Sequence, residues 1–287
     1  MRKTPIREAP DWAKLLADAV RTPGTLSQAY RQFWNYSVGN QILAWFECLS
    51  RHIQPGPINT FAGWLELGRY VKKGEKAITL CMPVTVKCKK KVVEPVGGIH
   101  TGNDTEPSTG SHAQADDSAD TITVFVFKPR WFVLSQTEGE PYVPTELPEW
   151  SEARSLQTLS IERIDFTHPN GNCQGLALGR QVAISPIAVL PHKTLFHELA
   201  HVILGHTADG PLEDHDHTPR SLREAEAEGV ALICCESLNL LGAAECRGYM
   251  QHWLAGATIP DRNVQRIMKA ADAIIKAGHP QKTPTLD

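Results

Sequence analysis

The sequence predicts a two-domain α+β protein, on the basis of three observations. The chain has 287 residues, which is enough for two domains that each bury a core. Apolar residues at helical spacing alternate with short β-prone segments in both halves. Three prolines between positions 141 and 148 are typical of a linker. We therefore expect an N-terminal α/β domain over residues 1–140, a linker over 141–150 and a second domain over 151–287.

The first domain should begin with helices and continue with strands. Residue Ser37 is a suitable N-cap for the third helix, and the Pro-Gly-Pro at 55–57 ends the helical region. The polar stretch 97–120 contains almost no large apolar residue, so we expect a mobile hairpin insertion there. The expected helices cover about 11–20, 26–34, 37–49 and 60–67, and the expected strands cover 77–80, 83–88, 122–127 and 131–134.

The second domain should be a mixture of two short strands and four helices. Branched apolar residues indicate strands at 161–166 and 182–184. Helical spacing is clearest in the last segment, where Val264, Ile267, Ala271 and Ile274 fall on one face. The expected helices cover about 192–204, 221–241, 244–255 and 260–277.

Composition excludes several classes of protein. The sequence is 41% hydrophobic and 21% charged, which is ordinary for a globular chain and excludes a wholly disordered or fibrous one. No apolar run is long enough to span a membrane, and the first residues lack the apolar block of a secretory signal. The seven cysteines contain no C-x-x-C pair. We therefore expect a cytoplasmic protein with reduced thiols and no membrane partner.

Charge is distributed unevenly along the chain. The first 100 residues carry 15 Lys and Arg against 7 Asp and Glu, whereas the residues from Ser135 onward carry 12 against 20. Such an asymmetry is typical of a basic module for a polyanion joined to an acidic module. Solvated faces without a partner would give the same counts, so charge alone leaves both interpretations open.

The sequence TLFHELAHVILGH contains the strongest functional motif. His197 and His201 stand four residues apart on an expected helix, so both imidazoles project from one face and can bind one cation. In helices of the H-E-x-x-H type, the carboxylate at the position of Glu198 acts as a general base for water. Two hydrogen-bonded histidines would satisfy the same spacing, but a third ligand is available downstream. We expect one Zn²⁺ ion here, or another divalent ion in its place.

The third ligand should come from the segment LREAEAEGVALICC. Glu224 and Glu228 are four residues apart on one face of an expected helix. We predict Glu224 as the metal ligand and Glu228 as a carboxylate that hydrogen-bonds a ligand histidine. Spacing alone does not separate Glu224, Glu228 and His206 as the third ligand. We expect Glu226 to point elsewhere into solvent, His206 to be a structural or rim residue, and the acidic His-rich stretch 212–220 to be a solvated loop.

Aromatic residues alternate with cations in the basic half. Single-stranded nucleic acid is bound by cations along its phosphates and by aromatic faces that stack on its bases. Most of these aromatics recur near helical spacing and belong more often to a core, so we select the cations as the DNA contacts. The predicted contacts are Arg31, Arg69, Lys72, Lys73, Lys76, Lys87, Lys89, Lys90, Lys91, Lys128 and Arg130.

These motifs together resemble a known family. The segments NYSVGNQILAW, FAGWLELGRYVKKGEKAITLCMPV and FVFKPRWFVLSQTEGEP resemble the N-terminal domain of ArdC antirestriction proteins, which occur on conjugative plasmids and other mobile elements. The later order LGRQVAISP, KTLFHELAHVILGH and REAEAEGVALI resembles the zincin-like metallopeptidase domain that follows it. The resemblance covers about residues 10–275. The segment 97–120 and the loop near Asp214 depart from the family pattern.

The resemblance implies a function and a role for each site residue. It implies a single-stranded-DNA-binding domain followed by a zinc peptidase domain, which together protect incoming DNA from host restriction. It implies His197, His201 and Glu224 as metal ligands and Glu198 as the general base. Two alternatives stay open: a DNA-binding protective protein with a catalytically silent zinc site, and a peptidase that cleaves a repressor while DNA serves only as a tether. The sequence names neither the protein substrate nor the oligomeric state.

Overall fold

The structure is a computed structural model that describes residues 10–87, 121–168, 172–207 and 219–280. Its helices are α1 (Trp12–Arg21), α2 (Thr25–Phe33), α3 (Val38–Ser50), α4 (Phe61–Glu66), α5 (Glu152–Leu159), α6 (Pro191–Ile203), α7 (Arg220–Ser237), α8 (Ala243–Gly256) and α9 (Asp261–Gly278). Its strands are β1 (Ile58–Thr60), β2 (Arg69–Val71), β3 (Ile78–Lys87), β4 (Thr121–Val133), β5 (Thr137–Gly139), β6 (Glu162–Arg163), β7 (Gly175–Leu178) and β8 (Gln181–Ile184). None of the described helices is long and apolar enough to cross a bilayer.

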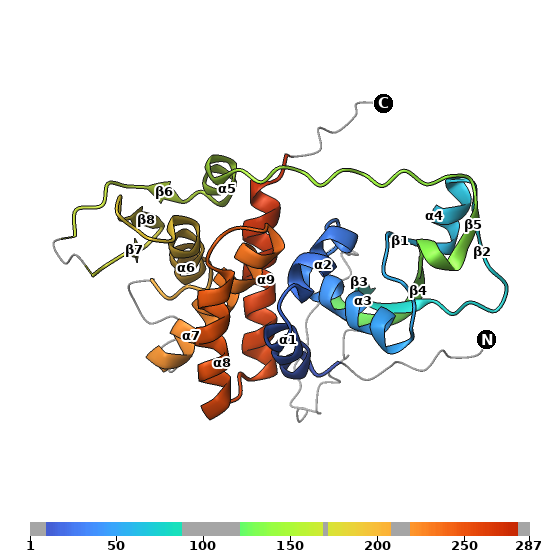
Figure 1. The fold of residues 1–287 in the computed structure, drawn as a ribbon, viewed down its shortest axis with the longest axis horizontal. Coiled ribbons are helices and arrows are strands. Elements are labelled where there is room, and N and C mark those ends of the chain that lie inside the picture. Colours follow the sequence, from blue (N-terminus) through green and yellow to red (C-terminus); the bar gives the residue numbers. More distant parts are fainter. Residues whose placement is uncertain (1–9, 88–120, 169–171, 208–218, 281–287) are drawn as a thin grey trace, which may run out of the picture.

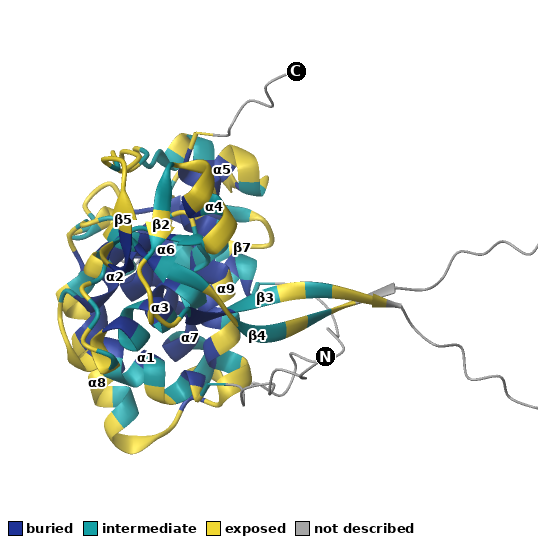
Figure 2. Cartoon of the chain, turned by 90° about the vertical axis from the view of Figure 1, so that its right-hand side faces the viewer, coloured by how far each residue is buried: buried dark blue, intermediate teal, exposed yellow. Residues whose placement is uncertain are grey.

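The N-terminal sheet is built around a long antiparallel hairpin. Strand β3 pairs over its whole length with Thr121–Trp131 of β4, and the two strands project from the body of the molecule (Figure 2). The order is β1-β4-β3, so β3 is an edge strand. An edge strand tolerates Pro83, which cannot donate to a ladder, and this is why the two strands expected at 77–80 and 83–88 form one continuous strand. The expected insertion at 97–120 lies outside the described residues.

The C-terminal part combines a small sheet with a group of helices. Its sheet has the order β6-β8-β7, in which β6 runs parallel and β7 antiparallel to β8. Helix α6 packs against this sheet on one side and against α7 on the other (Figure 1). Helix α7 is buried almost all round between α6, α8, α9 and α2. The mixed helix-and-sheet class is confirmed, while strand β7 and helix α5 were not expected from the sequence.

The main hydrophobic core contains residues from both sides of the expected linker. Residues of α1, α2 and α3, such as Leu16, Leu26 and Ile42, lie in the same buried cluster as Ile233 and Ile267 of the C-terminal helices. A second, smaller cluster lies between α2, α3 and the N-terminal sheet. The segment 140–150 has no helix or strand and runs between β5 and α5 (Figure 1). The three N-terminal helices share their core with the C-terminal part. The division into two domains at 141–150 stays a prediction.

Acidic side chains of the C-terminal helices cap the N-terminal ones. Glu236 accepts a hydrogen bond from the N–H of Leu26 at 3.1 Å, where α2 has no cap of its own. Asp272 does the same for Val38 at the start of α3, at 3.1 Å, and Asp261 for Ala13 in α1, at 2.8 Å. Each carboxylate satisfies an N–H that the helix leaves without a partner and stabilises the positive end of the helix dipole.

Candidate metal centre

Helix α6 carries the motif and is defined at both ends by its sequence. Pro191 occupies the first turn, where its missing N–H costs nothing. Gly205 ends the helix with a positive φ of 77°. There the N–H of Gly205 bonds to the carbonyl of Val202 and the N–H of His206 to that of His201, which is a Schellman motif. The turn places His206 beside His201.

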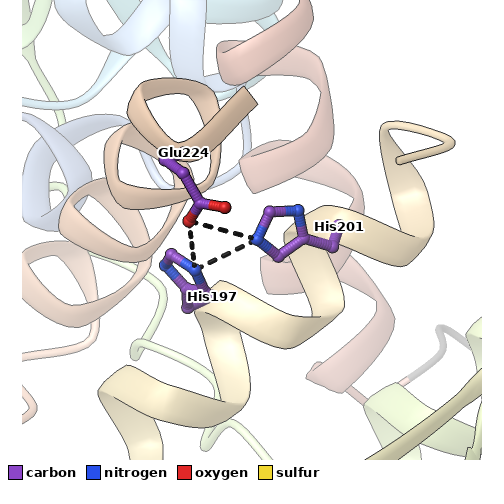
Figure 3. Close-up of side chains that lie close together, drawn as sticks. All are labelled: His197, His201 and Glu224. Carbon is purple, nitrogen blue, oxygen red and sulfur yellow. Dashed lines mark hydrogen bonds and ion pairs between the residues drawn. The ribbon is translucent and has the colours of Figure 1, made fainter. Parts of the chain in front are cut away.

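Three side chains from two helices converge in front of α6. Among the described residues, His197, His201 and Glu224 form the one group of three or more ligand-type side chains with donor atoms within 4.8 Å of one another. The Nε2 atoms of the two histidines are 3.0 Å apart, and Glu224 Oε2 lies 3.3 Å from His197 Nε2 and 3.7 Å from His201 Nε2 (Figure 3). Of the three candidates for the third ligand, Glu224 is the one that faces both imidazoles.

This geometry fits a small divalent ion. Two ligands on a tetrahedral Zn²⁺ ion, each at about 2.0–2.1 Å, lie roughly 3.3 Å from each other. The separations of 3.0, 3.3 and 3.7 Å in this site bracket that value. Nitrogen and carboxylate donors are also the set that Zn²⁺ and related ions accept. The orientation of the two imidazole rings also suits a shared ion, because each ring directs its Nε2 toward the Glu224 carboxylate.

Glu228 lies behind His197. Its Oε1 is 3.5 Å from His197 Nδ1 and accepts a bond from Lys193 Nζ at 2.6 Å. The other Glu228 oxygen and His197 Nδ1 are buried without a full hydrogen bond among the described residues. A modest rotation would join the two, so the structure places Glu228 where the sequence predicted a carboxylate for a ligand histidine. Lys193 was missed by the sequence analysis, although it stands one helical turn before His197.

Glu198 lines a cleft next to the three donors. The cleft has a volume of about 480 Å³ and lies between α6 and the start of β7, with His197, Glu198, Thr194 and Gly175 on its walls. A Cβ atom on Gly175 would lie 2.5 Å from Thr194 Cγ2 and 3.0 Å from Glu198 Oε1. Only glycine allows β7 to approach the helix this closely. Gly175 was not predicted from the sequence, because β7 is short and was not expected.

The electrostatics suit metal binding and base catalysis. Burial lowers the pKa of His197, but Glu224 and Glu228 outweigh this and raise it to about 9. Hydrogen bonds to His197 and His201 hold the pKa of Glu224 well below its ordinary value, so that carboxylate is ionised at neutral pH. Burial raises the pKa of Glu198, while the two histidines partly offset the effect. A carboxylate with a raised pKa is a better proton acceptor at neutral pH than an ordinary one.

Glu226 does not point into solvent, which corrects the expectation from the sequence. Its side chain is fully buried and accepts bonds from His206 Nε2 and from Asn263 Nδ2, both at 3.0 Å. Arg266 Nη1 lies 3.2 Å from Oε1, the oxygen that Asn263 also contacts. Burial raises the pKa of Glu226, but these donors outweigh it and lower the pKa below its ordinary value. The expected solvated loop at 212–220 lies mostly outside the described residues.

The predicted DNA contacts fall into three groups. Arg69 and Lys72 donate to backbone oxygens, as in the 3.0 Å bond from Lys72 Nζ to Ser135, and so also hold the fold. Arg31, Lys73, Lys76 and Arg130 are exposed and Lys128 is half-buried. Lys89, Lys90 and Lys91 lie outside the described residues, and the side chain of Lys87 is not described.

Two of the aromatic residues that alternate with cations in the basic half are exposed. Trp64 is buried, whereas Phe61 is 52% exposed at the start of α4 and Tyr70 is 59% exposed on β2. Helix α4 packs against both β1 and β2. Phe61 and Tyr70 are therefore the aromatic side chains of this region that a base could reach, together with Lys73 and Lys76 in the turn that follows β2.

Comparison with known proteins identifies the N-terminal part. Residues 10–125 match the family described as the N-terminal domain of anti-restriction factor ArdC. No curated protein matches the sequence. Two crystal structures of the antirestriction ArdC protein from the R388 plasmid, one metal-free and one Mn(II)-bound, share the fold. Each is 18% identical to this chain, with a TM-score of 0.51. Both matches cover 94% of this chain, and they cover 96% of the metal-free and 98% of the Mn(II)-bound plasmid protein. Residues 10–125 are thus an ArdC N-terminal domain, and the chain as a whole shares the fold of the R388 protein.

Proposed function

We propose that this chain is an antirestriction protein of a mobile genetic element that binds single-stranded DNA and hydrolyses peptide bonds at a divalent-metal site. The convergence of His197, His201 and Glu224, with Glu198 beside them in an open cleft, carries the peptidase part of the proposal. The match of residues 10–125 to the ArdC N-terminal domain supports the antirestriction part.

The ion is proposed to be held by His197 Nε2, His201 Nε2 and Glu224. The Mn(II)-bound structure of the R388 protein supports a divalent ion in this fold, and the two imidazoles with one carboxylate favour Zn²⁺. When bound, such an ion supplies a Lewis acid for the substrate carbonyl and lowers the pKa of water at its open position.

Glu198 is proposed as the general base. Its carboxylate lines the cleft, and its raised pKa suits a group that takes a proton from the attacking water and gives it to the leaving amine. The C–N bond of the peptide breaks as the new C–O bond forms, so the products are a carboxylic acid and an amine.

The DNA interface is proposed on the N-terminal part, around the turn after β2. Lys73, Lys76 and Arg130 supply exposed positive charge, and Phe61 and Tyr70 supply exposed aromatic faces. Cations that follow phosphates and rings that stack on bases bind single strands with little sequence preference.

The Glu198→Gln variant tests the peptidase. It removes the base but keeps the shape of the side chain, so the metal content should equal that of the wild type. New protein N-termini in cells that express the wild type, and their absence with Glu198→Gln, would support hydrolysis. Identical N-termini in both would contradict it. Full antirestriction by Glu198→Gln would instead favour DNA protection with a silent site, and loss of a single repressor would favour the tethered peptidase.

A further inference from the structure

Beyond the ligands, a buried chain of polar groups leads away from His201. His201 Nδ1 lies 2.9 Å from His206 Nδ1, and His206 Nε2 lies 3.0 Å from Glu226 Oε2. The side chains of His206 and Glu226 are 4% and 0% exposed. Water therefore cannot replace these contacts without a change in the structure.

This row of hydrogen-bonded side chains is held in place at both ends. The Schellman turn at Gly205 bonds the N–H of His206 to the carbonyl of His201 at 2.8 Å and brings the two ring centroids to 5.1 Å. At the far end, Asn263 and Arg266 of α9 hold Glu226 at 3.0 and 3.2 Å. Arg266 also donates to the carbonyl of Leu204 at 2.8 Å, which ties the end of α6 to the same group.

The donors and acceptors of this chain can be ordered in one way when His201 Nε2 binds a cation. His201 must then carry its hydrogen on Nδ1 and donate it to His206 Nδ1. His206 Nδ1 is an acceptor in that arrangement, so His206 carries its hydrogen on Nε2. That hydrogen is donated to Glu226, which as a carboxylate only accepts. Every bond in the chain is satisfied in this order.

We propose that His206 and Glu226 are positioning residues that fix the tautomer and the orientation of His201 for metal binding. This rests on the proposed metal site, because His201 is its ligand. On the other ligand histidine, Glu228 takes the corresponding place at His197 Nδ1. Each ligand histidine thus has a carboxylate behind it. Glu228 lies directly beside His197, whereas Glu226 acts on His201 through the imidazole of His206.

The test measures Zn²⁺ affinity by competition with a chelator, and histidine tautomers by ¹⁵N NMR, on the full chain. Glu226→Gln and His206→Gln should each lower the affinity by roughly 10–100-fold. In the Zn²⁺-loaded wild type, His201 should show hydrogen on Nδ1 and His206 hydrogen on Nε2, with the His206 signals assigned by their loss in His206→Gln.

Glu236→Gln is the matched control. Glu236 is a buried acid of the same helix that caps α2 and pairs with Arg247, away from the metal centre. Its loss should lower thermal stability without changing Zn²⁺ affinity. Wild-type affinity in both test variants would overturn the proposed positioning role of His206 and Glu226. Hydrogen on Nδ1 of His206 in the wild type would overturn it as well. A wild type that binds no Zn²⁺ would instead reject the metal site itself.

Discussion

The ammonium group of Lys193 lies 2.6 Å from Glu228 Oε1, in the first turns of the helix that presents His197. Burial raises the pKa of Glu228, but the nearby His197 ring and the hydrogen bond from Lys193 outweigh this and lower the pKa to about 2. Lys193 therefore keeps a buried carboxylate ionised behind His197, a proposed metal ligand. Without that cation, the imidazole of His197 alone would face the buried charge of Glu228.

Replacement of Lys193 by Met should destabilise the protein. A fully buried pair that loses one partner costs about 3–5 kcal/mol, and because Lys193 is partly exposed we expect about 1–3 kcal/mol. Denaturant unfolding of the metal-free protein measures this. The control is Lys276→Met, which breaks the more exposed pair with Asp272 and should cost less than about 1 kcal/mol. Equal losses for the two variants would show that Lys193 has no special role.

Substitution of Gly175 by Ala should separate metal binding from catalysis. The added methyl would collide with Thr194 Cγ2 and press on the Glu198 carboxylate, while the three metal donors lie outside these contacts. We expect Zn²⁺ affinity within a factor of about three and a loss of hydrolysis of about 100-fold, the size typical of a misplaced general base. Gly248→Ala on α8 is the control, since its Cβ would meet nothing within 4 Å. Unchanged hydrolysis by Gly175→Ala would contradict the proposed role of Glu198.

Stability and metal affinity should respond to pH in opposite directions. The pKa of His197 in the metal-free fold is about 9, above its ordinary value of 6.5. A raised pKa means that the stabilising contribution is complete below pH 6.5 and is lost as the pH rises toward 9. Metal binding requires the neutral ring, so Zn²⁺ affinity should increase by up to roughly tenfold per pH unit over the same interval.

Thermal unfolding of the metal-free protein and chelator competition from pH 6 to 9 provide the measurement. Glu228→Gln removes one of the carboxylates that raise the pKa of His197, so both curves should move to lower pH. A melting temperature independent of pH, together with an affinity independent of pH, would show that His197 is already neutral in the metal-free fold.

Binding of single-stranded DNA should depend on both charge and stacking. Lys73→Ala with Lys76→Ala should weaken binding and reduce the slope of log K against log salt by roughly 1–2. Phe61→Ala with Tyr70→Ala should cost about 1–3 kcal/mol per stacked base and leave that slope unchanged. Fluorescence anisotropy with a labelled oligonucleotide measures both, and Lys269→Ala, which removes an exposed cation of α9, is the control for charge. Tighter binding of duplex than of single strands would contradict the proposal.

The sequence predicted the local features of the metal centre and missed those that depend on distant segments. The H-E-x-x-H spacing places two imidazoles on one face of any helix, so His197 and His201 were accessible from the pattern alone. Spacing alone did not separate Glu224, the predicted ligand, from Glu228, and it is the packing of α7 on α6 that brings Glu224 to face both imidazoles. Glu226 was misjudged because helical periodicity assigns a face to solvent, whereas α7 is surrounded on all sides.

In the fold too, the elements with local signals were predicted and those without them were not. Helix α6 runs from Pro191 to Ile203, close to the expected 192–204, because its ends are marked by proline and glycine. Strand β7 has four residues and a glycine at its start, which leaves no periodic signal. The partners of Glu226 come from α9 and from the turn after α6, about 40 and 20 residues away along the chain. A local pattern carries no information about such partners.

The acidic caps supplied by Asp261, Glu236 and Asp272 have a consequence for how the molecule can be divided. Each of the first three helices depends on a carboxylate encoded more than 200 positions downstream. Proteolytic cleavage within the segment 140–150 should therefore leave two fragments that stay associated and migrate as one species in a native gel. Separately produced halves would need to meet before either acquired its native structure.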